Sequence, residues 1–146
     1  IIQGLPAGIG DPFFDSVESK LSQMMFSIPA IKGIAFGDGF DLAAMRASQA
    51  NDDFYYDQQT VKTRTNHNGG INGGITNGMP VVFQLAVKPT PSISQPQQTI
   101  DTDTKQNCTL EITGRHDPCI VQRAVPVVEA AVAWTLLDLY LGAQRM

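Results

Sequence analysis

A run of glycine and asparagine in the middle of the chain limits its possible folds more than any other segment. Residues 65–78 read Thr-Asn-His-Asn-Gly-Gly-Ile-Asn-Gly-Gly-Ile-Thr-Asn-Gly, with five glycines and four asparagines. Glycine adopts positive φ at no steric cost, and asparagine tolerates it, so the run is predicted to be a loop. Because glycine carries no side chain, backbone amides in such a loop can approach a bulky, flat or charged ligand.

The segment after this loop changes character twice. Residues 79–87 are mostly apolar, and residues 88–92 read Lys-Pro-Thr-Pro-Ser. A lysine and two hydroxyls held by prolines can bind an anion, because the ammonium and hydroxyl groups donate hydrogen bonds from a stiff backbone. Loop and lysine segment together predict a site for a phosphate-bearing ligand.

Composition sets the class of protein. The 146 residues are enough for a single domain covering 1–146, and 42% hydrophobic residues can build a core. The net charge of -4, without a basic block, argues against nucleic acid as a partner. No apolar run of spanning length is recognised, so no membrane helix is expected. The first residues carry neither a start methionine nor a basic region, so we expect a fragment without a signal peptide.

The two cysteines, Cys108 and Cys119, stand outside any metal-binding spacing. We expect free thiols in a reducing cytoplasm and no metal site.

The first half of the chain is expected to hold one long helix and one strand. Apolar residues recur at helical spacing between about residues 13 and 26, after an N-cap at Asp11 with Pro12 behind it. Residues 31–36 are predicted to be a strand, 37–39 a turn and 42–47 a short helix. Residues 51–63 are expected to be irregular.

The second half is expected to pack a strand on a helix. Alternation over residues 79–87 predicts a strand with one fully buried face. Residues 94–107 are predicted to be a loop with a turn at 101–103, and 108–112 a further strand. An apolar stripe over residues 125–144 predicts a helix that packs on the 79–87 strand.

A polar turn precedes that last helix. Residues 114–119 read Gly-Arg-His-Asp-Pro-Cys. In one interpretation Arg115 holds an anion and Asp117 accepts a proton at the same ligand. In the other, which is favoured for this turn alone, Arg115 and Asp117 form a surface pair and Asp117-Pro118 caps the helix.

The motifs form a recognisable series when taken in order. Behind the glycine loop and the Lys-Pro-Thr-Pro-Ser segment come Gly-Arg-His-Asp-Pro-Cys and, at residues 123–130, Arg-Ala-Val-Pro-Val-Val-Glu-Ala. Ahead of them stand Gly-Ile-Gly-Asp-Pro at 8–12, Ser-Ile-Pro-Ala-Ile-Lys-Gly at 27–33 and Gly-Asp-Gly-Phe at 37–40. This order resembles the C-terminal portion of chorismate synthase, over nearly the whole of this chain.

The resemblance implies an activity and a fold. Chorismate synthases convert 5-enolpyruvylshikimate 3-phosphate to chorismate and phosphate by an anti-1,4-elimination, the last shared step of aromatic amino acid biosynthesis. They need reduced FMN, and the resemblance leaves open whether the full protein reduces its flavin itself, with NADP, or depends on a separate reductase. The implied fold is α+β, a layered β-α-β sandwich of the chorismate synthase type, and the implied assembly is a homotetramer.

The resemblance also assigns residues. Asp117 corresponds to the family's aspartate near the flavin N5 and is the implied catalytic residue. His67 and His116 are expected to be structural, because the family's catalytic histidines lie in the N-terminal part. The implied FMN-binding residues are Pro29, Ala30, Gly73, Lys88, Pro89, Thr90, Pro91, Ser92 and Arg115.

Two departures and two alternatives accompany the resemblance. Ala47 stands where the family tends to have glycine, and Gln122 where proline is common. Without the upstream histidines and substrate-binding arginines, this chain alone is expected not to turn over. The alternatives are a non-catalytic flavin- or phosphate-binding module and an oligomerisation module.

Overall fold

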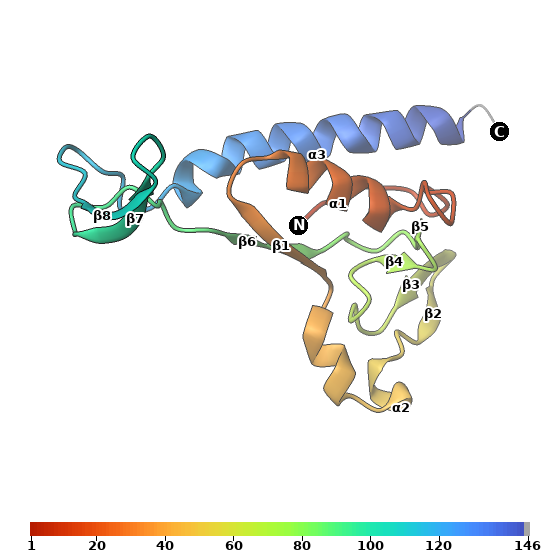
Figure 1. Cartoon of the computed structure of the whole chain (residues 1–146). Helices are drawn as coiled ribbons and strands as arrows, with labels where there is room; N and C mark the ends of the chain where they lie inside the picture. Colours follow the sequence, from red (N-terminus) through yellow and green to blue (C-terminus); the bar gives the residue numbers. More distant parts are fainter. Residues whose placement is uncertain (145–146) are drawn as a thin grey trace.

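Two helices cover one face of a small antiparallel sheet in the computed structural model, which describes residues 1–144 (Figure 1). The helices are α1 (Val17–Ser27) and α3 (Val121–Ala143), and the strands are β1 (Ile31–Phe36) and β6 (Phe83–Val87). Helix α1 packs against both α3 and β1. The mixture of helices and small antiparallel sheets confirms the predicted α+β class.

The core lies between these elements. Its buried members come from the loop before α1, from α1, from the start of β1, from the glycine loop, from the segment before β6 and from the middle of α3, namely Ile9, Val17, Leu21, Met25, Ile31, Ile71, Val81, Val132 and Leu136. Residues Val17, Leu21 and Met25 recur at helical spacing, so the predicted stripe of α1 is confirmed at these positions.

Helix α1 begins later than the sequence predicts. Its N-cap is Ser16, whose Oγ accepts a hydrogen bond from the Ser19 N–H at 3.1 Å. Residues 11–15 form a loop instead, closed by two backbone hydrogen bonds between Asp11 and Asp15. Phe14, which lies in the segment predicted to be helical, is 89% exposed.

The central sheet pairs segments far apart in the chain. Ile34 faces Leu85 and Phe36 faces Phe83 in an antiparallel register. The strand predicted over 79–87 is shorter, since β6 starts at Phe83, but Val81 is fully buried and pairs with Ile2 in an isolated bridge. Phe83, Leu85 and Val87 are only partly buried, so the face predicted to be fully buried is half-covered.

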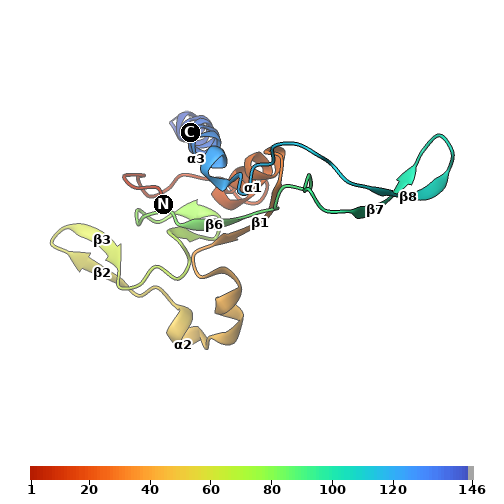
Figure 2. The same ribbon diagram turned by 90° about the vertical axis from the view of Figure 1, so that its left-hand side faces the viewer.

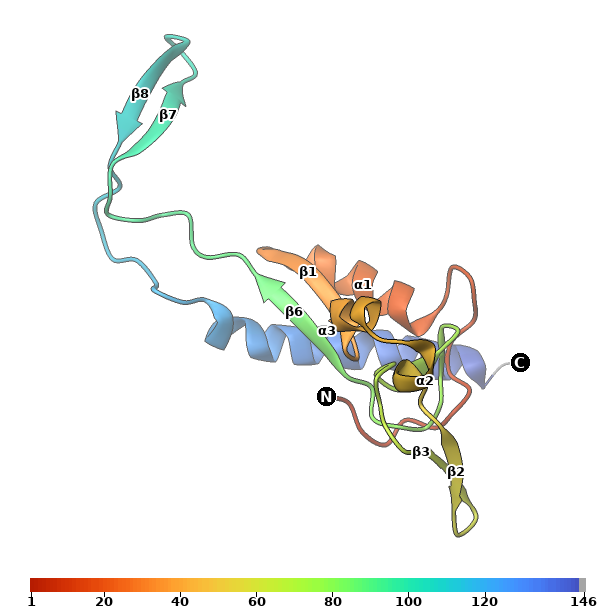
Figure 3. The same cartoon turned by 90° about the horizontal axis from the view of Figure 1, so that it is seen from below.

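Three hairpins complete the sheet content. They are β2 (Phe54–Asp57) with β3 (Thr60–Thr63), β4 (Ile71–Asn72) with β5 (Ile75–Thr76), and β7 (Gln97–Asp101) with β8 (Gln106–Leu110). Two of them overturn the irregular structure predicted for 51–63 and 94–107, although the turn predicted at Asp101 is present. The β7–β8 hairpin projects far from the helices (Figures 2 and 3).

Two short helical segments join β1 to the first hairpin. They are η1 (Gly39–Ala44) and α2 (Ala47–Ala50). The single short helix predicted over 42–47 is therefore divided into two, with a break at Met45 and Arg46.

Helix α3 begins at Val121 rather than Val125, so Pro126 lies inside the helix instead of at its first turn. This 23-residue helix contains an 18-residue window with a mean hydropathy of 1.5, so by length and composition it suffices to cross a membrane. The expectation that no segment reaches spanning length is therefore wrong, although a helix that packs in a protein core passes the same criterion. Here Val132 and Leu136 pack in the core, while Trp134 and Leu137 are 73% and 59% exposed.

Candidate functional site

The pairing of β1 with β6 brings two of the predicted ligand segments together. Ile31 at the start of β1 faces Val87 at the end of β6. The turn before β1 and the Lys-Pro-Thr-Pro-Ser segment after β6 therefore lie side by side, and the Lys88 N–H donates to the Ala30 carbonyl at 2.7 Å. Ala30 and Lys88, which are far apart in the sequence, are thereby fixed next to each other.

The turn before β1 has an unusual backbone. Ala30 has a φ of +73°, and the Ile31 N–H donates to the Ile28 carbonyl at 3.3 Å. This is the arrangement of a type II turn, with Pro29 at its second position and a residue of positive φ at its third. Alanine in place of glycine there costs about 1–2 kcal/mol, and such strain concentrates at ligand sites.

A pocket of ≈ 380 Å³ opens beside this turn. It is lined by Ala30 and Lys32 from the β1 side, by Ile120 from the start of α3, and by Lys88, Pro89, Thr90 and Pro91. Neither Lys32 nor Lys88 is in an ion pair within residues 1–144. Two free ammonium groups at one small pocket suit an anionic ligand.

Thr90 supplies a further polar group at this pocket. Its Oγ1 is buried and has no hydrogen-bond partner within the described residues. A buried hydroxyl without a partner costs about 1–3 kcal/mol, so native sites normally satisfy it. A ligand that carries phosphate and hydroxyl groups, as FMN does, fits this combination of lysines and an unpaired hydroxyl.

The remaining predicted contacts lie outside this pocket. Pro29 is exposed in the turn, and Ser92 is half-buried beyond Pro91, but neither lines the pocket. Gly73 belongs to the β4–β5 turn, whose next residue, Gly74, packs against Ser16 at the start of α1. Ala30 follows the other end of α1, and an 11-residue helix is about 16 Å long. One copy of this chain therefore does not bring Gly73 to the pocket.

The glycine loop packs mainly against backbone atoms of neighbouring segments of the same chain. A Cβ on Gly69 would lie 2.5 Å from the Gly37 nitrogen, and one on Gly70 would lie 2.5 Å from the Pro80 carbonyl oxygen. At Gly73, by contrast, a Cβ would meet nothing within 4 Å. Close packing therefore explains why most of these positions are glycine, without a ligand. In the β4–β5 turn, only Gly73 has free space where a side chain would be.

The turn before α3 holds Arg115 and Asp117 apart from the pocket. The Asp117 Oδ2 lies 2.8 Å from Arg123 Nη1, so its ion-pair partner is Arg123 rather than Arg115. The cap of α3 is Ile120, without a side-chain hydrogen bond, so the predicted capping by Asp117 is wrong. Arg115 is exposed, and Ile120 is the residue of this segment that reaches the pocket.

Both histidines have partners. His67 Nδ1 lies 2.5 Å from the Asp38 Oδ2, and His116 Nε2 lies 3.0 Å from the Ile112 carbonyl oxygen. Neither ring lines the pocket beside Lys88.

Sequence reasoning gave no role to Lys32 or to Asp52. A lysine in an otherwise apolar strand, two residues after Ala30, is the signal that identifies Lys32. Asp52 is buried and organises the start of the glycine loop: its carboxylate accepts from Thr65 Oγ1 at 2.7 Å, from the His67 N–H at 2.8 Å, and from the Asn68 N–H and Nδ2 at 2.9 and 2.8 Å.

We expect Asp52→Asn to lower the free energy of unfolding by about 2–4 kcal/mol at neutral pH, because an amide cannot accept four such hydrogen bonds. Burial alone raises the pKa of Asp52, but the hydrogen bonds from Asn68, Thr65 and His67 outweigh it and hold the pKa below the ordinary 3.8. The stabilisation is therefore present above pH 3.8 and is lost as the pH falls through the lower pKa of the folded state.

Urea unfolding of the wild type, Asp52→Asn and the exposed neighbour variant Asp53→Asn, between pH 7 and pH 2.5, measures this effect. Wild type and Asp52→Asn are expected to converge at the acid end. Equal losses for Asp52→Asn and Asp53→Asn at neutral pH would contradict a specific role for Asp52.

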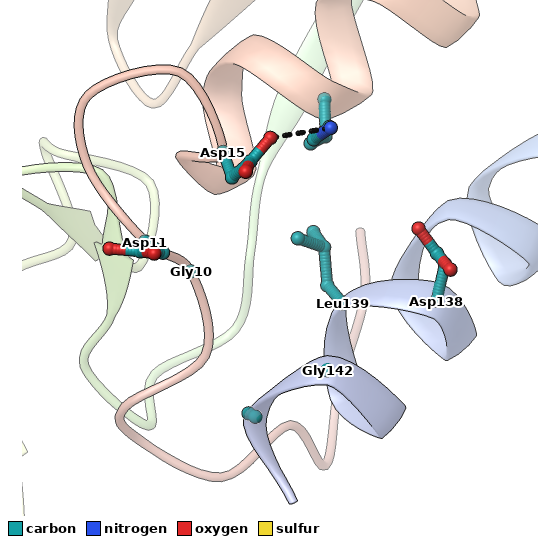
Figure 4. Close-up of a pocket in the computed structure, with 8 residues that line it drawn as sticks. Gly10, Asp11, Asp15, Asp138, Leu139 and Gly142 are labelled. Atoms are coloured by element: carbon teal, nitrogen blue, oxygen red, sulfur yellow. Dashed lines mark ion pairs between the residues drawn. The ribbon is translucent and has the colours of Figure 1, made fainter. Parts of the chain in front are cut away.

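A second hollow, of ≈ 320 Å³, lies between the loop before α1 and the end of α3 (Figure 4). Asp11, Asp15 and Asp138 line it, and its one lysine, Lys20, already pairs with Asp15. This balance of charge is unsuited to a phosphate, and none of the predicted ligand residues lines the hollow.

The chain matches known proteins along nearly its whole length. The model of a family described as chorismate synthase matches residues 1–141. A chorismate synthase of Dehalococcoides mccartyi is 52% identical over 95% of this chain, and one of Methanothermobacter thermautotrophicus is 49% identical over 94%. A solved structure titled "Crystal Structure of Chorismate Synthase" superposes on 62% of this chain with a TM-score of 0.58 and 36% identity.

These matches cover a minority of each relative. The chain spans 38% of the Dehalococcoides protein, 37% of the Methanothermobacter protein and 28% of the solved chain. The sequence thus spans about two fifths of the length of the curated relatives that it matches.

Proposed function

The chain belongs to the chorismate synthase family, and on this premise we propose that it is the C-terminal portion of an enzyme that converts 5-enolpyruvylshikimate 3-phosphate to chorismate and phosphate. The reaction is a carbon–oxygen lyase step, the last shared step of aromatic amino acid biosynthesis. The whole protein contains the remaining catalytic and substrate-binding groups, and this portion supplies part of a site for reduced FMN.

One observation carries the proposal for the cofactor. Five of the residues that the family resemblance assigns to FMN line a single pocket: Ala30, Lys88, Pro89, Thr90 and Pro91. Lys32 adds a second positive charge, and the unpaired Thr90 Oγ1 adds a hydrogen-bonding group. Lys88 and Lys32 would hold the phosphate, and Thr90 would bond a ribityl hydroxyl or a phosphate oxygen.

The chemistry that reduced FMN supplies when bound is electron density for the carbon–oxygen bond that breaks. In this chain Asp117 is the residue proposed to hold and move a proton, at the flavin N5. Its ion-pair partner is Arg123, whose Nη1 lies 2.8 Å from the Asp117 Oδ2. Gly73 and Arg115 are proposed to contact FMN in the complete protein, where other parts of the assembly surround the pocket.

The homotetramer and the cytoplasmic location remain parts of the same proposal. The exposed apolar face of α3, which includes Trp134 and Leu137, supports association with further protein surface. The proposal places the protein in the reducing cytoplasm, where the free thiols of Cys108 and Cys119 persist.

We expect Lys88→Met to raise the dissociation constant of FMN for the full-length protein by about 10–100-fold, the equivalent of one lost charge-assisted hydrogen bond. Thr90→Val, which keeps the volume and removes the hydroxyl, should raise it by about 10-fold. Isothermal titration with FMN measures both changes.

Lys105→Met is the matched control, because Lys105 is an exposed lysine in the turn between β7 and β8. Its affinity for FMN should equal that of the wild type. Unchanged affinity in both Lys88→Met and Thr90→Val would remove the pocket from the cofactor site. FMN binding without turnover by the full-length protein would favour the binding-module alternative.

A further inference from the structure

The sheet of β1 and β6 has one paired edge and one open edge. The Gly37 N–H donates to the Val82 carbonyl at 2.9 Å, and the Lys88 N–H donates to the Ala30 carbonyl at 2.7 Å, so the even-numbered residues face β1. Successive residues of a strand turn their backbone groups to opposite edges. Phe83, Leu85 and Val87 therefore present N–H and C=O groups to the edge away from β1, where no strand pairs with β6 within residues 1–144.

The start of the chain already lies on this open edge. The Ile2 N–H donates to the Val81 carbonyl at 2.8 Å, and the Val81 N–H donates back to the Ile2 carbonyl at 2.9 Å. This bridge is antiparallel, and Val81, two residues before Phe83, turns its backbone groups to the same edge as Phe83. Residues that precede Ile1 and keep its direction would run along β6 toward Val87, on the side where the N-terminus lies in Figure 3.

The bridge also fixes the register. Antiparallel partners advance in opposite directions, so each step back from Ile2 is a step forward from Val81. The first residue before Ile1 would face Phe83, the third Leu85 and the fifth Val87. Directly opposed residues project from the same face of a sheet, so these three side chains would join those of Phe83, Leu85 and Val87.

An apolar groove of ≈ 260 Å³ receives that face. Ile1, Phe83, Leu85 and Val87 line one side, and Val121 and Val125 of α3 line the other. Val121 and Val125 are 44% and 49% exposed, so the groove is incompletely filled by residues 1–144. Side chains that enter it would gain about 25 cal/mol per Å² of apolar surface removed from water.

We propose that the segment preceding Ile1 in the full-length protein is a strand that pairs antiparallel with the open edge of β6 and places its first, third and fifth side chains, counted back from Ile1, in this groove. The inference rests on the proposed function, which makes this chain the C-terminal portion of a longer protein. The curated relatives are long enough to supply the segment, because this chain spans 38% of the Dehalococcoides protein. The pairing closes an edge that would otherwise invite aggregation.

Hydrogen exchange of the full-length protein tests the pairing. The amides of Phe83, Leu85 and Val87 should exchange at least about 10²-fold more slowly than unprotected amides, and comparably to those of Gln84 and Ala86, which face β1. Electron-transfer fragmentation resolves these neighbouring amides. Exchange of the odd-numbered amides at the unprotected rate would overturn the proposal.

Two variants of equal composition test the register. The six residues before Ile1 are replaced in the full-length protein by Thr-Val-Thr-Val-Thr-Val, which puts valine in the groove, or by Val-Thr-Val-Thr-Val-Thr, which puts threonine there. The first should melt about 5 °C or more above the second. Equal melting temperatures, or the opposite order, would overturn the inferred register.

The other occupant of such an edge is a second copy of the chain. Protection of Phe83, Leu85 and Val87 that rises with protein concentration would identify a second copy and refute the upstream strand. All of these measurements are made without FMN. If these amides are protected but FMN does not bind, the result counts against the proposed function alone. If FMN binds but these amides are unprotected, the result counts against this inference alone.

Discussion

Asp117→Asn in the full-length protein is expected to lower kcat by about 10²–10⁴-fold while the affinities for FMN and substrate change little. Asparagine keeps the size of the side chain and one hydrogen-bonding oxygen, but it cannot take up and return a proton. The expected loss therefore falls on the chemical step, if the carboxylate manages the proton at the flavin N5. Steady-state rates with reduced FMN measure it.

The ion pair with Arg123 supplies the control for this prediction. Arg123→Gln removes the same 2.8 Å contact between Arg123 Nη1 and Asp117 Oδ2 but keeps the carboxylate. The side chains are 73% and 36% exposed, so the pair contributes about 0–1 kcal/mol to stability, and both variants should fold with similar melting temperatures.

The two variants separate three roles. A large loss of kcat in Asp117→Asn with near wild-type kcat in Arg123→Gln supports a carboxylate that acts on a proton. Equal losses in both would make the ion pair a positioning device for the turn before α3. Near wild-type kcat in Asp117→Asn would remove Asp117 from the mechanism.

The sequence predicted those elements whose signals are local. The buried stripe of Val17, Leu21 and Met25, and the strand Ile31–Phe36, both follow from spacing within a few residues. The start of α1 was misplaced because Asp11 and Pro12 have the composition of a helix start, whereas Ser16 forms the cap. Residues 11–15 instead close on themselves through backbone bonds, which no residue preference reveals.

The missed hairpins lack the usual turn residues. The turn between β2 and β3 puts Gln58 at a φ of +57°, and that between β7 and β8 puts Lys105 at +56°. Asparagine or glycine normally marks such positions. With glutamine or lysine there, the polar strands on either side look like irregular loops.

The candidate site was predictable in its residues but not in its geometry. The motif order identified Ala30 and Lys88, yet their contact depends on the pairing of β1 with β6, which are separated by more than 40 residues of loops and hairpins. The same limit explains Gly73. In the sequence, each glycine of a glycine-rich loop looks equivalent to the others. Only the structure shows which of them pack against backbone.

The glycines that pack against backbone should tolerate substitution least. Gly37→Ala is expected to lower the free energy of unfolding by about 2–5 kcal/mol, the sum of the left-handed backbone cost and overpacking. Gly37 has a φ of +56°, and a Cβ there would clash with the His67 carbonyl oxygen and lie 2.5 Å from the Gly69 nitrogen. Both atoms belong to the backbone of the glycine loop, which packs against the residue that follows β1. No side chain can therefore move aside to relieve the clash.

Gly73→Ala is a closely matched control. Its φ is +58°, almost that of Gly37, but a Cβ there would meet nothing within 4 Å. The two variants therefore share the backbone cost of about 1–2 kcal/mol and differ in the clash. Denaturant unfolding of both variants should show Gly37→Ala to be the less stable by about 1–3 kcal/mol.

The same pair separates folding from cofactor binding. If Gly73 contacts FMN in the complete protein, Gly73→Ala should weaken FMN binding while most of its stability remains, because the added methyl group occupies the open space of the β4–β5 turn. Gly37→Ala should instead cause a large loss of stability. Equal losses of stability in both variants would show that the backbone conformation, and not the close packing of Gly37 on the glycine loop, determines the cost.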